Sequence, residues 1–329
     1  VGIWSSNNVE WLLTQYAAAK VGVILVTINP AYRSHELDYV LGQSGCKGLI
    51  LQNQFKTSDY ESMISEICPE INEVNPGELK SNKFENLTTI ISMTSSKVKG
   101  IYDWKEFLNL SKNIDGKELE IRQDDLDVDD AINIQYTSGT TGFPKGATLS
   151  HHNILNNGYF TGATMNFTEK DRLVVPVPLY HCFGMVLANL ACLTHGACAI
   201  YPSEGFEPDS ALKAVEDEQA SALYGVPTMF IAELALPNFK EYNLKTLRTG
   251  LMAGSPCPIE TMKQVVELMH MKDVEIAYGM TETSPVSFQT KIDSPMEKRV
   301  STVGSVHPHV QVKIIDSESG KTCPIGETG

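Results

Sequence analysis

The chain has 329 residues, of which 42% are hydrophobic and 20% are charged, and its formal net charge is −14 at pH 7. This composition is typical of a folded globular protein, and the length predicts two or three lobes rather than one core. The acidic balance argues against a nucleic-acid-binding face, because such faces gather Lys and Arg. The seven cysteines have no C-x-x-C spacing, which argues against a zinc site or a disulfide framework.

The first segment, residues 1–51, alternates short apolar runs with helical patterns. Asn8 is a candidate helix cap, and Gly22 and Gly45 are candidate helix ends. The predicted order is strand 1–4, helix 9–20, strand 23–28, helix 34–41 and strand 47–51. This alternation predicts a parallel sheet with helices on its faces.

Residues 52 to about 130 are more polar and weakly periodic. An acidic cluster occupies 124–130. We interpret it as a solvated segment rather than a metal site, because no other candidate ligands lie nearby in the sequence. A strand at 132–136 follows, and a helix is predicted to begin near Ser150.

A second α/β series follows the Ser150 helix. The predicted order is strand 173–178, helix 183–194, strand 197–201, helix 209–218, strand 221–225, helix 228–236, strand 247–252, helix 258–270 and strand 273–278. Pro176, Pro178 and His181 interrupt the most apolar stretch, 173–201, which favours a buried strand and helix over a membrane span. Residues 310–316 alternate like a half-buried strand and lead into a turn at 316–321.

The most informative motif is YTSGTTGFPKG at 136–146, directly after the apolar strand. Its glycines let backbone N–H groups converge on an anion, and its hydroxyls add donors. Lys145 adds a movable positive charge. A Walker A loop needs Lys after the last glycine and then Ser or Thr, whereas Lys145 precedes Gly146. A slack surface loop is the alternative, but open α/β sheets bind ligands where a strand ends and a helix follows.

The motif resembles the signature loop of adenylate-forming enzymes, which include acyl-CoA synthetases, peptide-synthetase adenylation domains and luciferases. Three further segments resemble that family in order and approximate spacing: VPLYHCFG at 177–184, AGSP at 253–256 and AYGMTE at 277–282. The resemblance covers the whole chain. The segments INPAYRSHELDYVL and GATLSHHNILNN are most similar to those of medium-chain acyl-CoA synthetases of the family-member-2 type.

The resemblance implies an α/β fold. The chain would be an incomplete large N-terminal domain, made of two α/β subdomains and the start of a β-barrel piece. The implied subdomains are 1–168 with the phosphate-binding loop, 169–292 with the acyl and adenine pocket, and 300–329. It also implies ATP, Mg²⁺ and CoA as cofactor and co-substrates, and a fatty acid as the other small-molecule partner. No nucleic acid or membrane span is expected, and the oligomeric state stays open. A mitochondrial matrix location is implied, with the cytoplasm as the alternative.

The resemblance also assigns site residues. Thr281 would hydrogen-bond the α-phosphate, Glu282 would hold Mg²⁺, and His181 would position the substrate. Tyr278 would stack on adenine beside Ala253, Gly254 and Ser255. The β- and γ-phosphates would be held by Thr137, Ser138, Gly139, Thr140, Thr141, Gly142, Phe143, Pro144 and Lys145. The acyl pocket would be formed by Val226, Pro227, Gly250 and Gly279. His307 and His309 are interpreted as loop residues, because a third metal ligand is missing from the pattern.

Two family features are not found: the ribose-binding [YF]-x-[ST]-G-D segment and the C-terminal lid that carries the adenylation lysine. We therefore expect the chain to be a fragment at both ends, and impaired by itself because a lid completes such sites. The leading hypothesis is an ATP-dependent fatty acid–CoA ligase that forms an acyl-AMP intermediate. The alternatives are a non-catalytic nucleotide- and acyl-binding remnant, and an enzyme that adenylates another carboxylic acid, such as an amino acid.

Overall fold

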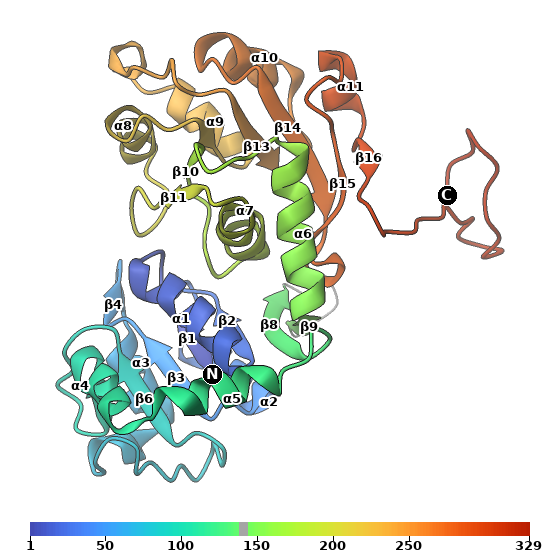
Figure 1. Cartoon of the computed structure of the whole chain (residues 1–329). Coiled ribbons are helices and arrows are strands. Elements are labelled where there is room, and N and C mark those ends of the chain that lie inside the picture. Colours follow the sequence, from blue (N-terminus) through green and yellow to red (C-terminus); the bar gives the residue numbers. More distant parts are fainter. Residues whose placement is uncertain (138–143) are drawn as a thin grey trace.

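The computed structural model describes residues 1–137 and 144–329, and these form two sheets one beyond the other (Figure 1). The first sheet has the strand order β7-β6-β3-β1-β2-β8-β9. Its strands are β1 (Gly2–Trp4), β2 (Leu25–Ile28), β3 (Gly48–Leu51), β6 (Thr89–Ser92), β7 (Ile101–Asp103), β8 (Ala131–Thr137) and β9 (Lys145–Ser150). All neighbours are parallel except β8 and β9, which run antiparallel.

The predicted alternation over residues 1–51 is confirmed. Helix α1 (Val9–Val21) begins after Asn8, whose side chain accepts a hydrogen bond from the Trp11 N–H, and it ends at Gly22 with φ of 67°. Helix α2 (Ser34–Ser44) follows β2, and Gly45 ends it with φ of 61°. Glycine suits both helix ends, because a side chain would strain the left-handed backbone.

The weakly periodic segment 52–130 contains more regular structure than its pattern indicated. Strands β6 and β7 extend the first sheet, and the rest of the segment forms β4 (Gln54–Phe55), β5 (Ser58–Asp59), α3 (Tyr60–Ile67), η1 (Pro69–Asn72), α4 (Trp104–Asn109), η2 (Leu110–Asn113) and α5 (Gly116–Asp124). The pattern failed because each element is short and α5 is exposed along nearly its whole length. The acidic residues of 124–130 are exposed, as the solvated interpretation requires.

The second sheet has the order β11-β10-β12-β13-β14-β15-β16. Its strands are β10 (Arg172–Val174), β11 (Cys198–Ile200), β12 (Ala222–Leu223), β13 (Thr249–Ala253), β14 (Asp273–Gly279), β15 (Val286–Gln289) and β16 (Ser305–Val306). Its body is parallel, and β15 and β16 add antiparallel strands. The accompanying helices are α8 (Pro208–Asp217), α9 (Pro227–Leu234), η4 (Phe239–Glu241), α10 (Ile259–Leu268), η5 (Thr281–Thr283) and α11 (Met296–Ser301).

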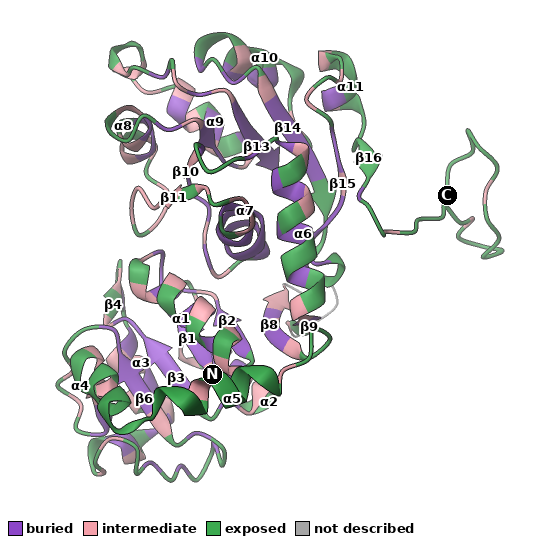
Figure 2. Cartoon of the chain, viewed as in Figure 1, coloured by how far each residue is buried: buried purple, intermediate pink, exposed green. Residues whose placement is uncertain are grey.

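Two elements join the sheets. Helix α6 (His151–Thr164) begins after Ser150, whose hydroxyl accepts from the Asn153 N–H, and it rises along the side of the second half (Figure 1). The predicted helix at 183–194 is a π-helical segment, η3 (Phe183–Leu190), continued by α7 (Ala191–His195). All residues of η3 are buried, and Figure 2 shows this buried segment at the centre of the molecule. No helix among the described residues is long and apolar enough to span a bilayer.

The side chain of Asn7 ties the two halves together. Its Nδ2 donates to the Val177 carbonyl oxygen at 2.9 Å, and its Oδ1 accepts from the Leu179 N–H at 2.8 Å. Gln15 of α1 makes a second tie, because its Nε2 donates to the Met185 carbonyl and its Oε1 accepts from Asn189. A hydrophobic core with residues from both halves, including Ile3, surrounds these contacts.

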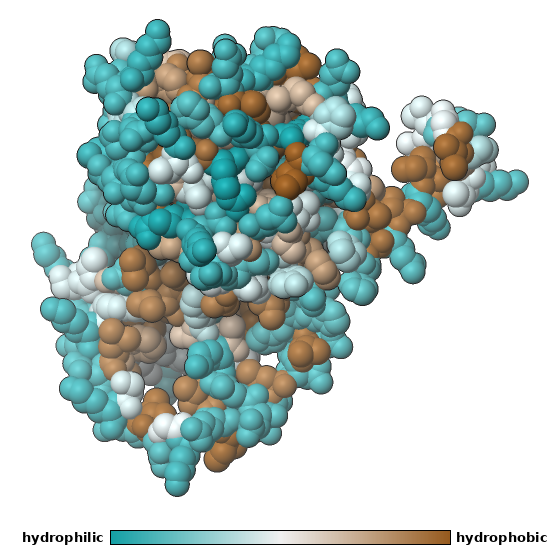
Figure 3. Space-filling model, turned by 45° about the horizontal axis from the view of Figure 1, so that its top comes forward, coloured by the Kyte–Doolittle hydropathy of each residue, from teal (hydrophilic) through white to brown (hydrophobic). Residues whose placement is uncertain are grey.

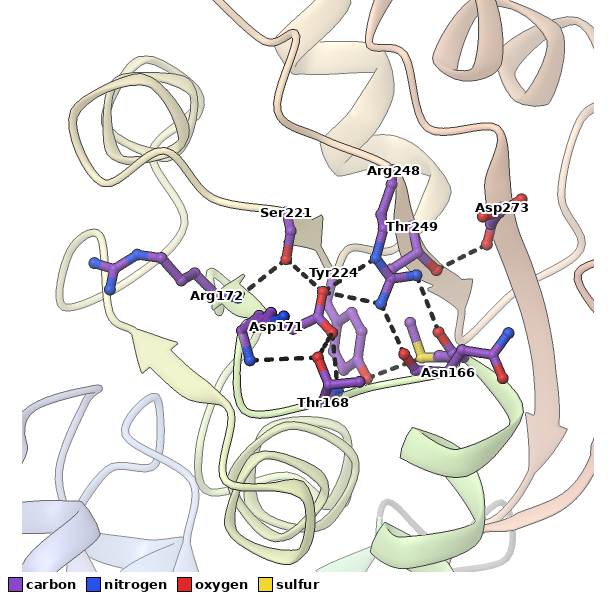
Figure 4. A network of polar contacts seen from close by, with 11 residues as sticks. Asn166, Thr168, Asp171, Arg172, Ser221, Tyr224, Arg248, Thr249 and Asp273 are labelled. Carbon is purple, nitrogen blue, oxygen red and sulfur yellow. Dashed lines mark hydrogen bonds and ion pairs between the residues drawn. The ribbon is translucent and has the colours of Figure 1, made fainter.

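Asp171 is the centre of a polar cluster in the second half (Figure 4). Its carboxylate accepts from the Thr168 N–H, the Ser221 hydroxyl and Arg248 Nε, and the guanidinium of Arg248 also donates to the backbone oxygens of Met165 and Asn166. Burial by itself would raise the pKa of Asp171, but the hydrogen bonds from Arg248 and Ser221 outweigh it and leave that pKa below its usual value. The cluster fixes the loop before β10 against β12 and β13.

The predicted strand at 310–316 is wrong. After β16 the chain leaves the body (Figure 1), and within the described residues this segment makes one isolated bridge, between Ile315 and Thr322. Val312 and Ile314 are about half exposed. An alternating pattern gives a strand only when another strand satisfies its backbone, and no neighbouring strand is present here among the described residues. The predicted turn at 316–321 is confirmed by hydrogen bonds between Asp316 and both Lys321 and Gly320.

Candidate active site

A cavity of about 560 Å³ lies where β8 and β9 of the first sheet face the end of β14 in the second. Eight of the predicted site residues line it: Thr137, Lys145, His181, Ala253, Gly254, Gly279, Thr281 and Glu282. They come from four separate segments of the sequence. The structure therefore brings the motifs at 136–146, 177–184, 253–256 and 277–282 together around one space.

The first wall of the cavity is the antiparallel pair β8–β9. Thr137 ends β8 and is paired in register with Lys145, the first residue of β9. Lys145 is exposed, so its ammonium group is free to reach an anion in the cavity. The Tyr39 hydroxyl donates to the Pro144 carbonyl at 3.1 Å and fixes the backbone beside this pair. Six predicted phosphate-loop residues lie outside the described residues: Ser138, Gly139, Thr140, Thr141, Gly142 and Phe143.

The facing wall is the end of β14 and the short helix η5. Gly279 lies against the backbone of Pro285, and a Cβ at this position would be 1.8 Å from the Pro285 carbonyl oxygen. Thr281 is 9% exposed, and its hydroxyl lies 3.9 Å from the sulfur of Cys182. Glu282 is exposed to the cavity and makes no ion pair with the described residues. This wall thus presents a hydroxyl and a carboxylate opposite the ammonium group of Lys145.

His181 lies between the two walls. Its Nδ1 accepts a hydrogen bond from the Phe183 N–H at 3.0 Å, so the ring proton is on Nε2. The ring is open to the cavity, yet the surrounding protein atoms desolvate it and lower the pKa of His181. A neutral imidazole can donate a hydrogen bond from Nε2, which suits the positioning of a substrate. Burial raises the pKa of the adjacent Cys182 to about 12, which excludes a thiolate at neutral pH.

Six described residues that were predicted for the site do not line this cavity, and Pro144, next to Lys145, is one of them. Tyr278 is about half exposed and packs edge-to-face on Phe288. Ser255 is exposed beyond the end of β13, and Pro227 is the first residue of α9. Gly250 lies within the sheet, where a Cβ would be 2.0 Å from the Leu223 carbonyl oxygen. Close strand packing explains Gly250 without a ligand, so its assignment to the acyl pocket stays a prediction.

Val226 is also absent from the lining, but it lies beside it. A Cβ on Gly254, which lines the cavity, would be 3.1 Å from the Val226 Cγ1 atom. Gly254 itself has φ of 90°, a conformation that favours glycine. Val226 therefore supports the wall behind Gly254 rather than forming its surface.

The sequence reasoning missed other lining residues. They are Asn29, Tyr32, Gln135, Tyr136, Tyr180, Cys182, Phe183, Leu187, Ala277, Met280, Pro285 and Val286. Phe183 and Leu187 are adjacent on one face of η3, at a spacing of four, so helical periodicity was the available signal. Asn29 and Tyr32 follow β2, and only the sheet order places that strand end beside β8.

The residues present fit one magnesium ion held together with a phosphate. Mg²⁺ in nucleotide sites commonly takes one or two carboxylates, and its other ligands are waters and phosphate oxygens. Glu282 supplies such a carboxylate at the cavity. Within residues 1–137 and 144–329, no cluster of three or more His, Cys, Asp or Glu side chains forms a complete protein cage for a metal.

The protein thus has a mixed α/β fold in which a lysine from one sheet and a carboxylate from the other line one cavity. The chain belongs to the family described as AMP-binding enzyme, whose sequence model matches residues 1–329. It is 49% identical over 316 residues to a putative acyl-CoA synthetase, YngI, of Bacillus subtilis (strain 168), covering 96% of this chain and 57% of that protein.

A human relative and a solved structure extend this comparison. The chain is 40% identical over 336 residues to the medium-chain acyl-CoA ligase ACSF2, mitochondrial, of Homo sapiens, covering 100% of this chain and 54% of that protein. The crystal structure of the anthranilate CoA ligase AuaEII with anthranoyl-AMP matches with a TM-score of 0.81 at 22% identity, covering 99% of this chain and 58% of that one. The chain thus spans about half the length of the curated relatives it matches, and the structural match supports the fold.

Proposed function

We propose that the full-length protein is an ATP-dependent fatty acid–CoA ligase that acts on medium-chain acids through an acyl-AMP intermediate. The observation that carries the proposal is the convergence of Lys145 and Glu282, from different sheets, on one cavity. An ammonium group and a carboxylate suited to Mg²⁺ are the groups that a bound triphosphate requires. The names of the relatives supply the reaction class.

In the first half-reaction, a carboxylate oxygen of the fatty acid attacks the α-phosphorus of ATP, and pyrophosphate leaves. Both reactants are anions, so the site must reduce their repulsion and align them. Lys145 would neutralise the departing phosphates, and the Thr281 hydroxyl would donate to the α-phosphate. Mg²⁺ held by Glu282 would supply further charge neutralisation. The neutral ring of His181 would orient the carboxylate from Nε2.

In the second half-reaction, the thiolate of CoA attacks the acyl carbonyl carbon of acyl-AMP, and AMP leaves. Cys182 takes no part as a nucleophile, because its thiol stays protonated. The acyl tail would lie against the apolar part of the lining, where Phe183, Leu187 and Ala277 are available. The medium-chain preference rests on the similarity to the human medium-chain ligase, and the subdomain limits at 168 and 292 stay predictions.

The test is pyrophosphate release by the full-length protein with saturated fatty acids of increasing chain length. We expect release that requires a fatty acid and is greatest at medium chain length. Release of phosphate or pyrophosphate without any fatty acid would contradict the ligase assignment. Detection of acyl-AMP before CoA is added would support the order of the two half-reactions.

The two alternatives make different predictions in the same assay. A non-catalytic binding remnant would bind ATP and release no pyrophosphate with any acid. An amino-acid adenylating enzyme would respond to amino acids, and it needs a carboxylate to meet the α-amino group. Glu282 is the single acidic residue among the described residues that line the cavity, and the proposal already uses it for Mg²⁺.

We also propose a mitochondrial matrix location, because the human relative is named as mitochondrial. The bacterial relative makes the cytoplasm the alternative. Fractionation of cells that express the full-length protein would distinguish the two compartments. Exclusive recovery with cytosolic markers would contradict the proposal.

A further inference from the structure

A second cavity of about 360 Å³ lies where the two halves meet, apart from the cavity described above. Its walls come from α1, β2, β8, α6, η3 and α7. The lining is almost entirely apolar, with Leu25, Ile132, Ile154, Met185 and Leu190 among its members. Figure 3 shows hydrophobic residues gathered on the surface between the upper and lower halves. The volume falls within the range of about 300–1,000 Å³ that is usual for small-molecule sites.

Two polar atoms at this cavity lack hydrogen-bond partners. Asn133 is 2% exposed, and its Nδ2 donates to the Leu25 carbonyl at 2.8 Å, but its Oδ1 has no partner among the described residues. The Nε2 atom of His151 is also enclosed and has no partner there. Both residues line the cavity. An enclosed polar atom without a partner is unfavourable, so this pair is a place where a ligand group gains a hydrogen bond.

The second cavity is separated from the candidate active site by a side-chain contact. Gln135 lies two residues after Asn133 on β8, so the two side chains are on the same face of the sheet. Gln135 lines the candidate active site, Met185 lines the second cavity, and the Gln135 Nε2 atom is 3.7 Å from the Met185 sulfur. A ligand in the second cavity would therefore bind beside η3 without occupying the nucleotide site.

We propose that this cavity binds an aliphatic molecule that carries a hydroxyl group, such as a fatty alcohol, as a ligand separate from the substrates of the ligase reaction. A hydroxyl can donate to Asn133 Oδ1, and it can accept from or donate to His151 Nε2 according to the ring tautomer, so it suits either atom. The aliphatic chain would bury its surface on the apolar walls. A carboxylate can only accept hydrogen bonds, so it cannot satisfy Asn133 Oδ1, and its burial is costly. Lys20 at the cavity could pair with a carboxylate, so the test includes one.

The experiment measures binding of octan-1-ol and of octanoate to the full-length protein without ATP, by isothermal titration calorimetry. We expect saturable binding of octan-1-ol, at least tenfold weaker when the cavity is filled by Ala19→Phe. The matched control is Leu13→Phe, on the same helix but outside the cavity lining, and we expect it to bind like the wild type. His151→Phe should weaken octan-1-ol about tenfold, because it removes one hydrogen-bonding atom and keeps an aromatic ring.

The outcomes separate this proposal from the proposed ligase function. Pyrophosphate release should persist in Ala19→Phe, whereas failure of the ligase assay in the wild type would leave octan-1-ol binding intact. No saturable binding, equal binding by Ala19→Phe and wild type, or octanoate binding to this cavity as tightly as octan-1-ol would overturn the proposal. If Ala19→Phe does not fold, Leu193→Glu at the exposed rim provides the test, with Leu268→Glu on α10 as its control.

Discussion

Two pairs of antiparallel strands face each other across the candidate active site, and they are built differently. In β8–β9, the first residue of β9 is Lys145, and it is exposed together with Gly146 and Thr148. In β14–β15, residues 274–277 of β14 are buried, and Gly279 lies directly on the Pro285 backbone. At Lys145 the first pair presents a charge with little packing around it, whereas Gly279 of the second pair lies against the packed backbone. We therefore expect substitution of Lys145 to affect activity alone, and substitution of Gly279 to affect activity and stability together.

The largest expected effect is the loss of activity on substitution of the exposed Lys145 in β8–β9. Lys145→Ala should lower the rate of pyrophosphate release about 10²–10³-fold, because one preorganised group that meets developing charge contributes about that much. The melting temperature should stay within about 1 °C of wild type, since the side chain is exposed and makes no ion pair with described residues. Lys170→Ala, also exposed, is the control. A large loss of stability in Lys145→Ala would remove the distinction between the two pairs.

The second prediction concerns Gly279 in β14. Gly279→Ala should lower the free energy of unfolding by about 3 kcal/mol and reduce activity, because the added Cβ would overlap the Pro285 carbonyl oxygen. Urea unfolding and pyrophosphate release measure the two effects. Wild-type stability together with lost activity would show that the β14–β15 backbone can move without cost to the core.

The third prediction tests the buried network behind β14. Gln289 Nε2 donates to Glu275, and Gln289 Oε1 is 2.9 Å from His307 Nε2. Burial raises the pKa of Glu275 to about 8 and lowers that of His307 to about 4. The folded state thus holds an extra proton on Glu275 between the ordinary carboxyl pKa and about 8, and stability falls as pH rises through this range. His307 has the opposite slope, and its stability contribution falls as pH falls from about 6.5 to about 4.

The Glu275 contribution can be isolated between pH 6.5 and 8 by comparing wild type with Glu275→Gln, because the His307 contribution is present in both proteins. Glu275→Gln should be more stable than wild type by about 1–3 kcal/mol at pH 8 and by less at pH 6.5, because it removes the burial of a carboxylate. Urea unfolding at the two pH values measures the difference. Parallel pH profiles for the two proteins would contradict the raised pKa of Glu275.

The smallest effect comes from a glycine outside both strand pairs. Gly42 lies within α2, and a Cβ added there meets no atom within 4 Å. Gly42→Ala should raise the free energy of unfolding by about 0.5–1 kcal/mol, because alanine is the better helix former. Its activity should equal that of wild type. A destabilised Gly42→Ala would weaken the geometric argument made for Gly279.

The sequence predicted the parts of this structure that depend on local chemistry. Asn8 and Ser150 cap helices as expected, because capping depends only on neighbouring backbone N–H groups. Strand β9 was missed, because its sequence KGATLS lacks the apolar alternation that marks a half-buried strand. Residues 310–316 have that alternation without a neighbouring strand among the described residues. Strand pairing depends on distant partners, so local patterns do not determine it.

For the candidate active site too, the residues in local motifs could be predicted, and those placed by distant contacts could not. The motifs around Lys145, His181 and Glu282 were predicted to act together, and the structure places these three residues on one cavity. Gln135 was missed, because a lone glutamine in a strand has no distinctive signal. The assignment of Gly250 to the acyl pocket stays a prediction, because glycine serves close strand packing as readily as ligand access and a sequence pattern does not distinguish these uses.

Asn7 gives the cavity a property that its lining residues do not reveal. One amide group holds both the Val177 carbonyl and the Leu179 N–H, in the segment that leads to His181. A hinge motion that separated the two sheets would have to break both hydrogen bonds at once, and water would replace them only as the halves opened. The pair therefore favours a constant spacing of the two walls. A substrate would bind in a cavity that is already formed. The entropy cost of ordering the two walls would therefore not weaken binding.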